Sequence, residues 1–265
     1  MTKFVCALLI DLDDAADFQD SAGSVLGRPM AAYPLMAART SAHVRRIYVV
    51  TGSPPVKAAA LQYDAIIIDP PPTDKPSLKD YLQHGRHEVA ADLGHEDTEL
   101  ELLVMLFPNA PAVTKDMIDS GVEALLDRPE LDSALSVAPM DRWAPNLTRR
   151  QNADGLLDPF LPAGKDPQAQ AVLNSPERAI AWYPTWGVTV LRPEILDSIS
   201  GDEAWPWLGR KILPIKTWGP GLIDYHWQLP GLEHWLKKNG IPDLSENLKR
   251  QPLPKPQLSP KDDRR

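Results

Sequence analysis

The stretch from Glu99 to Met140, ELELLVMLFPNAPAVTKDMIDSGVEALLDRPELDSALSVAPM, decides the fold class of this chain. Its apolar run from Leu102 to Leu106 is typical of a strand that is buried on both faces. Pro108 and Pro111 follow three residues apart and cannot continue a hydrogen-bonded ladder. We therefore expect the strand to end in a loop at Phe107.

A helix and a second strand follow this loop. Thr114 is placed to cap the helix, and apolar residues recur behind it at helical spacing, at Met117, Ile118, Val122, Leu125 and Leu126. Pro129 ends the helix, and Ala134 to Val137 predicts the next strand. A strand, a crossover helix and a strand form a right-handed parallel unit, with ligands beyond the carboxyl ends of its strands. Phe107 to Pro111 would then border any ligand site.

The remaining chain repeats this alternation of strands and helices. Short apolar runs predict strands at Val5 to Ile10, Ile47 to Thr51 and Ala65 to Asp69. Helices are predicted to open at Gly27 to Met30 and to span Val56 to Gln62. Strands that alternate with helices indicate a layered α/β domain with a largely parallel sheet.

Several of these segments also match the motifs of one known family in order and spacing. Leu106 to Pro111 corresponds to a loop of the type L-Q-P-T-S-P, and Asp132 to Val137 corresponds to D-S-x-x-S-V. Gly27 to Met30 matches G-K-P-L, and a helix and an apolar strand follow it as in the family. The chain resembles the cytidylyltransferases that activate acidic sugars, the CMP-sialic acid and CMP-Kdo synthetase group.

The resemblance runs from about Val5 to Gly240 and implies an architecture. It implies the three-layer nucleotide-diphospho-sugar transferase fold, which is glycosyltransferase-A-like, with a mostly parallel mixed sheet. Residues 1–247 would form a single domain. Residues 141–182 would be an inserted segment that projects from the core and pairs with a second subunit, giving a homodimer. The proline-rich, basic residues 248–265 lack an apolar period and predict a disordered tail.

The resemblance also implies an activity and a metal. The family transfers CMP from CTP to an acidic sugar and releases pyrophosphate, and its D-I-D pair binds Mg²⁺. Here the first acid of that pair falls on Leu222 and the second on Asp224, so Asp224 is the expected metal ligand. This motif is expected to end a strand just before a helix that has Pro230 in its first turn. Asp11 or Asp13 could supply the missing carboxylate if the first strand ends beside this loop.

Four further positions are candidates for nucleotide or sugar binding. Arg28 would be a cation near the phosphates, and Asn109 would face the base or the sugar. Phe107 occupies the position of the family's loop Gln. Gly187 is kept from an N-G-x-x-Y pattern whose Asn is replaced here by Trp186, and a glycine permits close backbone approach.

The segment from Asp11 to Ser24 departs from the family. It stands where the family has a glycine-rich cationic loop, yet it contains no Lys or Arg, one glycine and four carboxylates between Asp11 and Asp17. Carboxylates oppose the approach of a triphosphate. Two alternatives therefore stay open: a catalytically inactive relative that acts as a binding or partner subunit, and a metal-dependent phosphatase that uses Asp11 and Asp13.

Three polar or aromatic groups have ordinary structural explanations. His84 and His87 are spaced like a metal-ligand pair, but we expect a solvated helix or a flexible lid there. Arg149 and Arg150 could meet a substrate carboxylate, although charged surface pairs are usually solvated. The aromatic stretch from Trp205 to Arg210 is expected to close the core rather than to frame a pocket.

Composition limits the class of protein. A chain of 265 residues with 43% hydrophobic and 24% charged residues is ordinary for a soluble protein. Its net charge of −8 argues against nucleic acid as a partner. The apolar run at the first strand is too short to span a membrane. A single cysteine, Cys6, excludes a disulfide framework and fits a cytoplasmic protein.

Overall fold

The computed structural model describes residues 2–12, 23–139, 148–160, 182–197, 199 and 204–245. The expected ligand Asp13, the tail at 248–265 and much of the inserted segment at 141–182 lie outside these residues. Among the described residues, no helix is long and apolar enough to cross a membrane.

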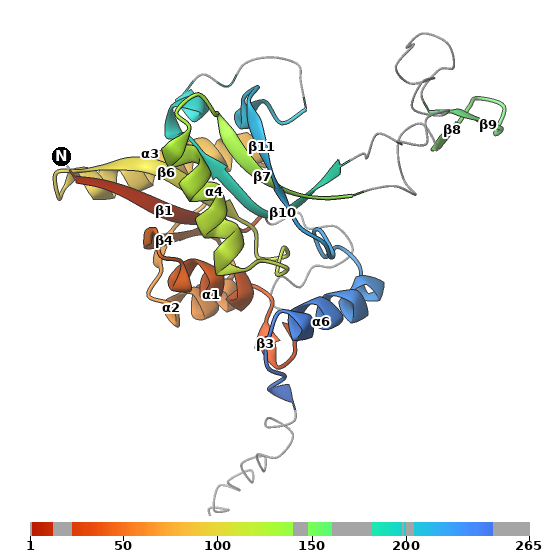
Figure 1. The fold of residues 1–265 in the computed structure, drawn as a ribbon, viewed down its shortest axis with the longest axis horizontal. Helices are drawn as coiled ribbons and strands as arrows, with labels where there is room; N and C mark the ends of the chain where they lie inside the picture. The colour runs from red at the N-terminus through yellow and green to blue at the C-terminus, as the bar shows by residue number, and fades with distance from the viewer. Residues whose placement is uncertain are drawn as a thin grey trace, which may run out of the picture.

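A seven-stranded mixed sheet forms the centre of the molecule (Figure 1). From edge to edge its strands are β11 (Ile212–Lys216), β7 (Ser133–Pro139), β10 (Trp182–Leu191), β6 (Thr98–Leu106), β1 (Thr2–Ile10), β4 (Val44–Val50) and β5 (Ile66–Ile68). Only β10 runs antiparallel to its neighbours in this sheet. The predicted strands at Val5, Ile47 and Leu102 therefore lie side by side in one sheet.

Helices cover both faces of the sheet and make three layers, as predicted. In Figure 1, α4 lies in front of the sheet and α3 behind it. One apolar cluster includes side chains of α1 (Ala32–Thr40), α2 (Pro54–Leu61), α4 (Lys115–Asp127) and α6 (Leu229–Lys238). The other includes side chains of α3 (Leu78–Gly94) and of the short helices η1 (Pro193–Asp197) and η2 (Pro206–Leu208).

The apolar runs form strands because both faces of the sheet need apolar side chains. Along β1, Ala7 and Leu9 join the first cluster, whereas Leu8 and Ile10 join the second. The side chain of Thr114 accepts a hydrogen bond from the Met117 amide and caps α4, as its position predicted.

Strands β6 and β7 run parallel to each other, as the sequence predicts, and β10 lies between them. Three sequence-based expectations about local structure are wrong. Arg28 does not open a helix; it lies in β3 (Arg28–Pro29), which pairs with β2 (Ser24–Val25) through a turn at Gly27, and α1 begins at Ala32. Leu126 is 41% exposed, unlike the rest of the apolar face of α4. Residues 222–224 form a loop rather than the end of a strand.

The polar segment at 73–98 contains α3, whose role is structural. A capping box between Ser77 and Asp80 starts this helix of 17 residues. Its buried face, which includes Leu82 and Val89, packs on the sheet. The expectation of a merely solvated helix or a lid missed this packing.

The described part of the inserted segment is a small hairpin of β8 (Arg149–Gln151) and β9 (Leu157–Pro159). Figure 1 places it apart from the seven-stranded sheet. Leu156, Leu157 and Phe160 are exposed on it, at 65%, 70% and 54%. A second copy covering these side chains remains a prediction.

Candidate functional site

The carboxyl ends of β1, β4 and β6 meet at one edge of the sheet. Asp11 follows β1 there and is 3% exposed. Its amide donates to the Val50 carbonyl oxygen at 3.0 Å, and its Oδ2 accepts the Thr51 hydroxyl at 2.6 Å. The carboxylate of Asp11 is thus fixed against the end of β4.

The loop after β6 contacts the segment that precedes α6 at the same edge. The Ile223 amide donates to the Asn109 carbonyl oxygen at 2.7 Å, and the side chain of Ile223 is fully buried. Asn109 Nδ2 lies 3.4 Å from Asp224 Oδ1, although the two residues are 115 positions apart. The structure therefore brings together two of the predicted site residues, Asn109 and Asp224.

Gln228 fixes the conformation of the Asp224 loop. Its Oε1 accepts hydrogen bonds from the amides of Asp224 and Tyr225, at 2.7 and 2.8 Å. Its Nε2 donates to the Leu222 carbonyl oxygen at 2.9 Å. In a strand, these backbone groups would form hydrogen bonds with a neighbouring strand. Here the Gln228 side chain forms those bonds instead, so the loop has a defined conformation without belonging to a sheet.

An irregular turn in β10 places Trp186 beside this loop. The Ser136 hydroxyl oxygen of β7 accepts from the Thr185 hydroxyl at 2.7 Å and from the Val188 amide at 3.0 Å. The register of β10 against β7 shifts there, and Trp186 takes a positive φ of 58°. Side-chain bonds from Ser136 thus hold a backbone conformation that a tryptophan rarely adopts.

Gly187 allows close packing inside the molecule. A Cβ atom at Gly187 would lie 3.0 Å from the Ala112 carbonyl oxygen and 3.5 Å from Met117 Cε. A side chain at this position would crowd the loop between β6 and α4, which gives the glycine a structural reason. Its contact with a nucleotide or sugar remains a prediction.

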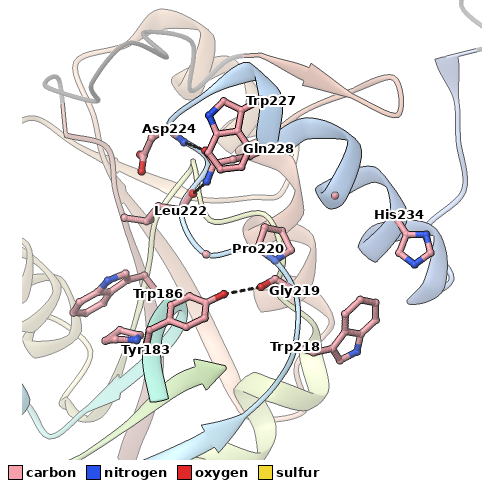
Figure 2. A pocket seen from close by; sticks show the side chains of 13 residues that line it. Tyr183, Trp186, Trp218, Gly219, Pro220, Leu222, Asp224, Trp227, Gln228 and His234 are labelled. Atoms are coloured by element: carbon pink, nitrogen blue, oxygen red, sulfur yellow. Dashed lines mark hydrogen bonds between the residues drawn. The ribbon is translucent and has the colours of Figure 1, made fainter. Parts of the chain in front are cut away.

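A cavity of about 700 Å³ lies between β10 and the segment leading into α6 (Figure 2). We call it the aromatic cavity, and its lining is Tyr183, Pro184, Trp186, Trp218, Gly219, Pro220, Gly221, Leu222, Asp224, Trp227, Gln228, Gly231 and His234. Figure 2 shows Tyr183 and Trp186 on one side and Trp218 and His234 on another. Its volume is typical of a small-molecule site.

The aromatic walls are held by specific contacts. The Trp186 ring meets the rings of Phe107 and Trp205 edge to face, with centroids 6.4 and 5.0 Å away. Phe107 is 6% exposed and packs against the Trp186 ring. Trp205, expected in the core, is instead 42% exposed beside Trp186.

The opposite wall is fixed by Gly219 and its neighbours. The Tyr183 hydroxyl donates to the Gly219 carbonyl oxygen at 2.9 Å, and burial raises the pKa of Tyr183. The Trp218 carbonyl oxygen accepts from Trp235 Nε1 at 2.6 Å. Trp218 and Trp227 remain 52% and 75% exposed, so their rings are available to a ligand.

A second cavity of about 520 Å³ lies at the same edge, on the side of β1 and β5. We call it the lysine cavity, and its lining is Leu12, Pro70, Pro71, Thr73, Lys75, Pro76, Leu78 and Tyr81. Lys75 is the cation of this lining. Leu12 in this lining belongs to the start of segment 11–24.

Arg28 lies away from both linings. Its Nη1 donates to the Pro242 carbonyl oxygen at 3.1 Å, and the Leu244 amide donates to the Leu26 carbonyl oxygen at 3.0 Å. Arg28 therefore attaches the chain after α6 to the β2–β3 turn. The structure does not bring Arg28 to Asn109 and Asp224.

The described residues offer an incomplete metal site. No three His, Cys, Asp or Glu side chains gather as ligands within the described ranges. Asp224 and the nearby Asn109 amide provide two oxygen-bearing groups. Because Mg²⁺ is commonly bound by one or two carboxylates together with substrate phosphates and water, this pair fits Mg²⁺ delivered with a nucleotide.

Sequence reasoning missed the aromatic walls and Lys75. Tyr183 lies in β10, whereas Trp218 and Trp227 lie in the segment between β11 and α6, and the three share no spacing pattern. Lys75 lies in a polar stretch with no motif around it. For the expected histidine pair, the structure shows His84 Nε2 at 3.0 Å from the Asp69 carbonyl oxygen, a contact that belongs to packing rather than to a metal.

Comparisons with known proteins agree with this fold. No protein-family model and no curated protein matches the sequence. The structure of CMP:2-keto-3-deoxy-manno-octonic acid synthetase complexed with CTP matches with a TM-score of 0.62 and 16% identity, covering 90% of this chain and all of the other. The 4-diphosphocytidyl-2C-methyl-D-erythritol synthase from Anaerococcus prevotii matches with a TM-score of 0.59 and 12% identity, covering 89% and 96%.

These two likenesses establish the fold. The chain has the three-layer α/β fold of solved cytidylyltransferases, as the sequence motifs implied.

Proposed function

We propose that this chain is a cytidylyltransferase that binds CTP and transfers CMP to an acceptor hydroxyl. One observation carries the proposal beyond the fold: Asp224 lies beside Asn109, at the sheet edge that also borders the aromatic cavity. Ligands of open α/β sheets bind beyond the carboxyl ends of the strands, where both residues lie. The acidic sugar implied by the sequence resemblance is the first acceptor to test.

The lysine cavity is the proposed nucleotide side. Lys75 supplies the cation that the segment after β1 lacks, and the proline-rich walls are stiff because proline fixes φ. The aromatic cavity is the proposed acceptor side. The loop at 107–111 follows β6, which lies between β1 and β10 in the sheet.

The reaction is a displacement at phosphorus. The acceptor oxygen forms a bond to the α-phosphorus of CTP, the bond from that phosphorus to the bridging oxygen breaks, and pyrophosphate leaves. The hydroxyl proton is released to solvent water. The chain's own contribution is positioning and electrostatic stabilisation, which account for most catalysis in phosphoryl transfer.

Mg²⁺ is the proposed cofactor, held by Asp224 with Asn109 beside it. When bound, the ion neutralises charge on the phosphates. Asp224 and Asn109 would hold the ion at the sheet edge where both cavities lie, and Gln228 holds the Asp224 backbone. Asp11 is a positioning residue in this account, because its carboxylate accepts the Thr51 hydroxyl.

Pyrophosphate release is the direct test. The full chain is incubated with CTP, Mg²⁺ and one candidate acceptor at a time: acidic sugars such as Kdo and N-acetylneuraminate, and neutral or cationic alcohols. The proposal expects pyrophosphate release that depends on CTP, on the acceptor and on Asp224, with loss of at least about tenfold in Asp224→Asn. Asp116→Asn, an exposed acid on α4, is the matched control. Release that is equal in Asp224→Asn and the parent would contradict the assignment.

A second candidate is a relative that binds ligands without turnover. Trp186 stands where the resembling family has an Asn, and Leu222 stands where it has a metal-binding Asp. Both residues line the aromatic cavity and add apolar surface where a ligand-binding polar group would be expected. This reading predicts CTP or acceptor binding with no pyrophosphate release for any acceptor.

The phosphatase hypothesis has less support. Asp11, its nucleophile, is 3% exposed and bonded to Thr51, and Asp13 lies outside the described residues. Phosphatase activity that disappears in Asp11→Asn would restore it.

A further inference from the structure

We infer that the aromatic cavity binds the substituted-ammonium end of a small acceptor, a choline-like alcohol or its phosphate ester, rather than an acidic sugar. That this molecule is the acceptor of CMP rests on the proposed function. That the cavity binds an ammonium group rests on the lining residues alone, and this binding can be measured without CTP.

The charge of the lining is the first argument. Thirteen residues line this cavity in the described structure, and none of them is Lys or Arg. Asp224 is the one carboxylate among them, and the other titratable side chains of the lining are Tyr183 and His234. A ligand carboxylate would have to leave water beside Asp224 without a cationic partner, which opposes binding. The lining as a whole therefore favours a cationic ligand over an anionic one.

Two cations on elements next to the cavity have other contacts. Lys216 of β11 lies over the Trp182 ring, 5.1 Å from its centroid, and Trp182 is not part of the lining. Lys237 of α6 pairs with Asp243 at 3.4 Å. Neither cation is part of the lining, where it could pair with a sugar carboxylate.

The second argument is the number of ring faces. Three tryptophans and a tyrosine line one cavity, and aromatic faces attract ammonium cations, most strongly those of tryptophan. Trp218 and Trp227 belong to neither apolar cluster of the fold, and both are exposed. Exposed aromatic side chains grouped around a cavity indicate a ligand site.

The third argument is geometric. Asp224 lies at the end of the lining that touches Asn109, whereas Trp218 and His234 lie on another side in Figure 2. A ligand with a reacting oxygen at one end and a bulky ammonium group at the other can place the oxygen near Asn109 and the ammonium among the rings. The cavity volume of about 700 Å³ accommodates a molecule of this size but not a folded protein segment.

The test compares choline with its uncharged isostere, 3,3-dimethylbutan-1-ol, by tryptophan fluorescence and calorimetry on the full chain. We expect saturable binding of choline with a Kd at least about tenfold lower than that of the isostere, and weaker binding still of N-acetylneuraminate. Phosphocholine is titrated in parallel, with and without Mg²⁺, to see which form binds more tightly.

Two variants locate the site. Trp227→Leu removes a ring that is 75% exposed, so the fold should persist, and choline affinity should fall about fivefold or more. Trp182→Leu is the matched control, because this tryptophan is also exposed but lies outside the lining. Circular dichroism verifies that both variants are folded.

Three outcomes would overturn the inference: equal affinity for choline and its isostere, tighter binding of N-acetylneuraminate than of choline, or equal loss in Trp227→Leu and Trp182→Leu. Failure of the proposed function has a different signature. Choline would then bind as expected, while CTP would neither bind nor release pyrophosphate.

Discussion

The two cavities lie at the same edge of the sheet but are built in different ways. The lysine cavity is lined mostly by neighbours in the sequence, residues 70–81, and three of them are prolines that restrict the backbone by themselves. The aromatic cavity combines β10 with residues 218–234, and hydrogen bonds from Ser136, Tyr183 and Gln228 hold its backbone.

This difference predicts which substitutions would change the shape of each cavity. A cavity of consecutive residues keeps its shape as long as its own segment is intact. A cavity assembled from distant segments depends on single side chains that bridge them. The same contrast holds for charge, because one lining carries Lys75 and the other carries Asp224.

The largest effect should come from Gly219→Ala. Gly219 has a φ of 116°, and a Cβ atom there would lie 2.3 Å from Trp235 Cδ1, inside the buried cluster. We expect a loss of on the order of 3 kcal/mol in the free energy of unfolding. Thermal unfolding should show a Tm lower by roughly 6–12 °C.

Gly231→Ala is the control for that variant. Gly231 also lines the aromatic cavity, but it lies in α6 and a Cβ atom there has no neighbour within 4 Å. Alanine should raise the stability by about 0.5–1 kcal/mol, as in other helix interiors. Equal Tm losses in both variants would show that the left-handed backbone of Gly219 is not what holds the wall.

Ser136→Ala tests the bridge between β7 and β10. The substitution leaves the buried Val188 amide and Thr185 hydroxyl without their partner, at a cost of about 1–3 kcal/mol. It should weaken choline binding and leave CTP binding unchanged, because Ser136 does not touch the lysine cavity. Ser120→Ala on the surface of α4 is the matched control for urea unfolding; a similar change in both would argue against the bridge.

Lys75→Ala probes the other cavity. Removal of this exposed cation should raise the Kd for CTP about threefold at low ionic strength, an effect that salt screens. Lys79→Ala on α3, outside the lining, should leave the Kd unchanged. If choline binding fell instead of CTP binding, the assignment of the two cavities would be reversed.

The smallest effect concerns Cys6 in the core of the sheet. Burial raises the pKa of this thiol to about 12, so its reactive thiolate is scarce at pH 8. The native chain should react with a thiol reagent far more slowly than the chain in 6 M guanidinium chloride. Rapid labelling of the native chain would show that the β1 region opens readily, in conflict with its place in the core.

The core of the fold could be predicted from the sequence, because burial on both faces leaves a direct pattern. The runs at Val5 and Leu102 are apolar without interruption, and Thr114 caps its helix where expected. The position of β10 between β6 and β7 could not be read in this way. Sheet order depends on which strands meet across the chain, and the residues from Trp182 to Leu191 carry no sign of their neighbours.

The candidate site could be predicted only in part. Asn109 and Asp224 were found through motifs, and the structure brings them together. The sequence did not indicate where Arg28 lies. Its hydrogen bond to the Pro242 carbonyl oxygen depends on the path of the chain after α6, which no local pattern around Arg28 reveals. The prediction of a strand at Leu222 was wrong. The Gln228 side chain and the Asn109 carbonyl oxygen form the hydrogen bonds of that backbone, and the local sequence does not indicate these contacts.

The measurement that tests the central claim most directly is calorimetric titration of CTP into the full chain, with and without Mg²⁺, repeated with Asp224→Asn and with the control Asp116→Asn. The account predicts that the parent and the control bind CTP more tightly with Mg²⁺, and that Asp224→Asn loses this gain, with a Kd for Mg²⁺-CTP at least about tenfold higher. A parent that binds no CTP, or an Asp224→Asn variant that binds Mg²⁺-CTP as tightly as the parent, would contradict it.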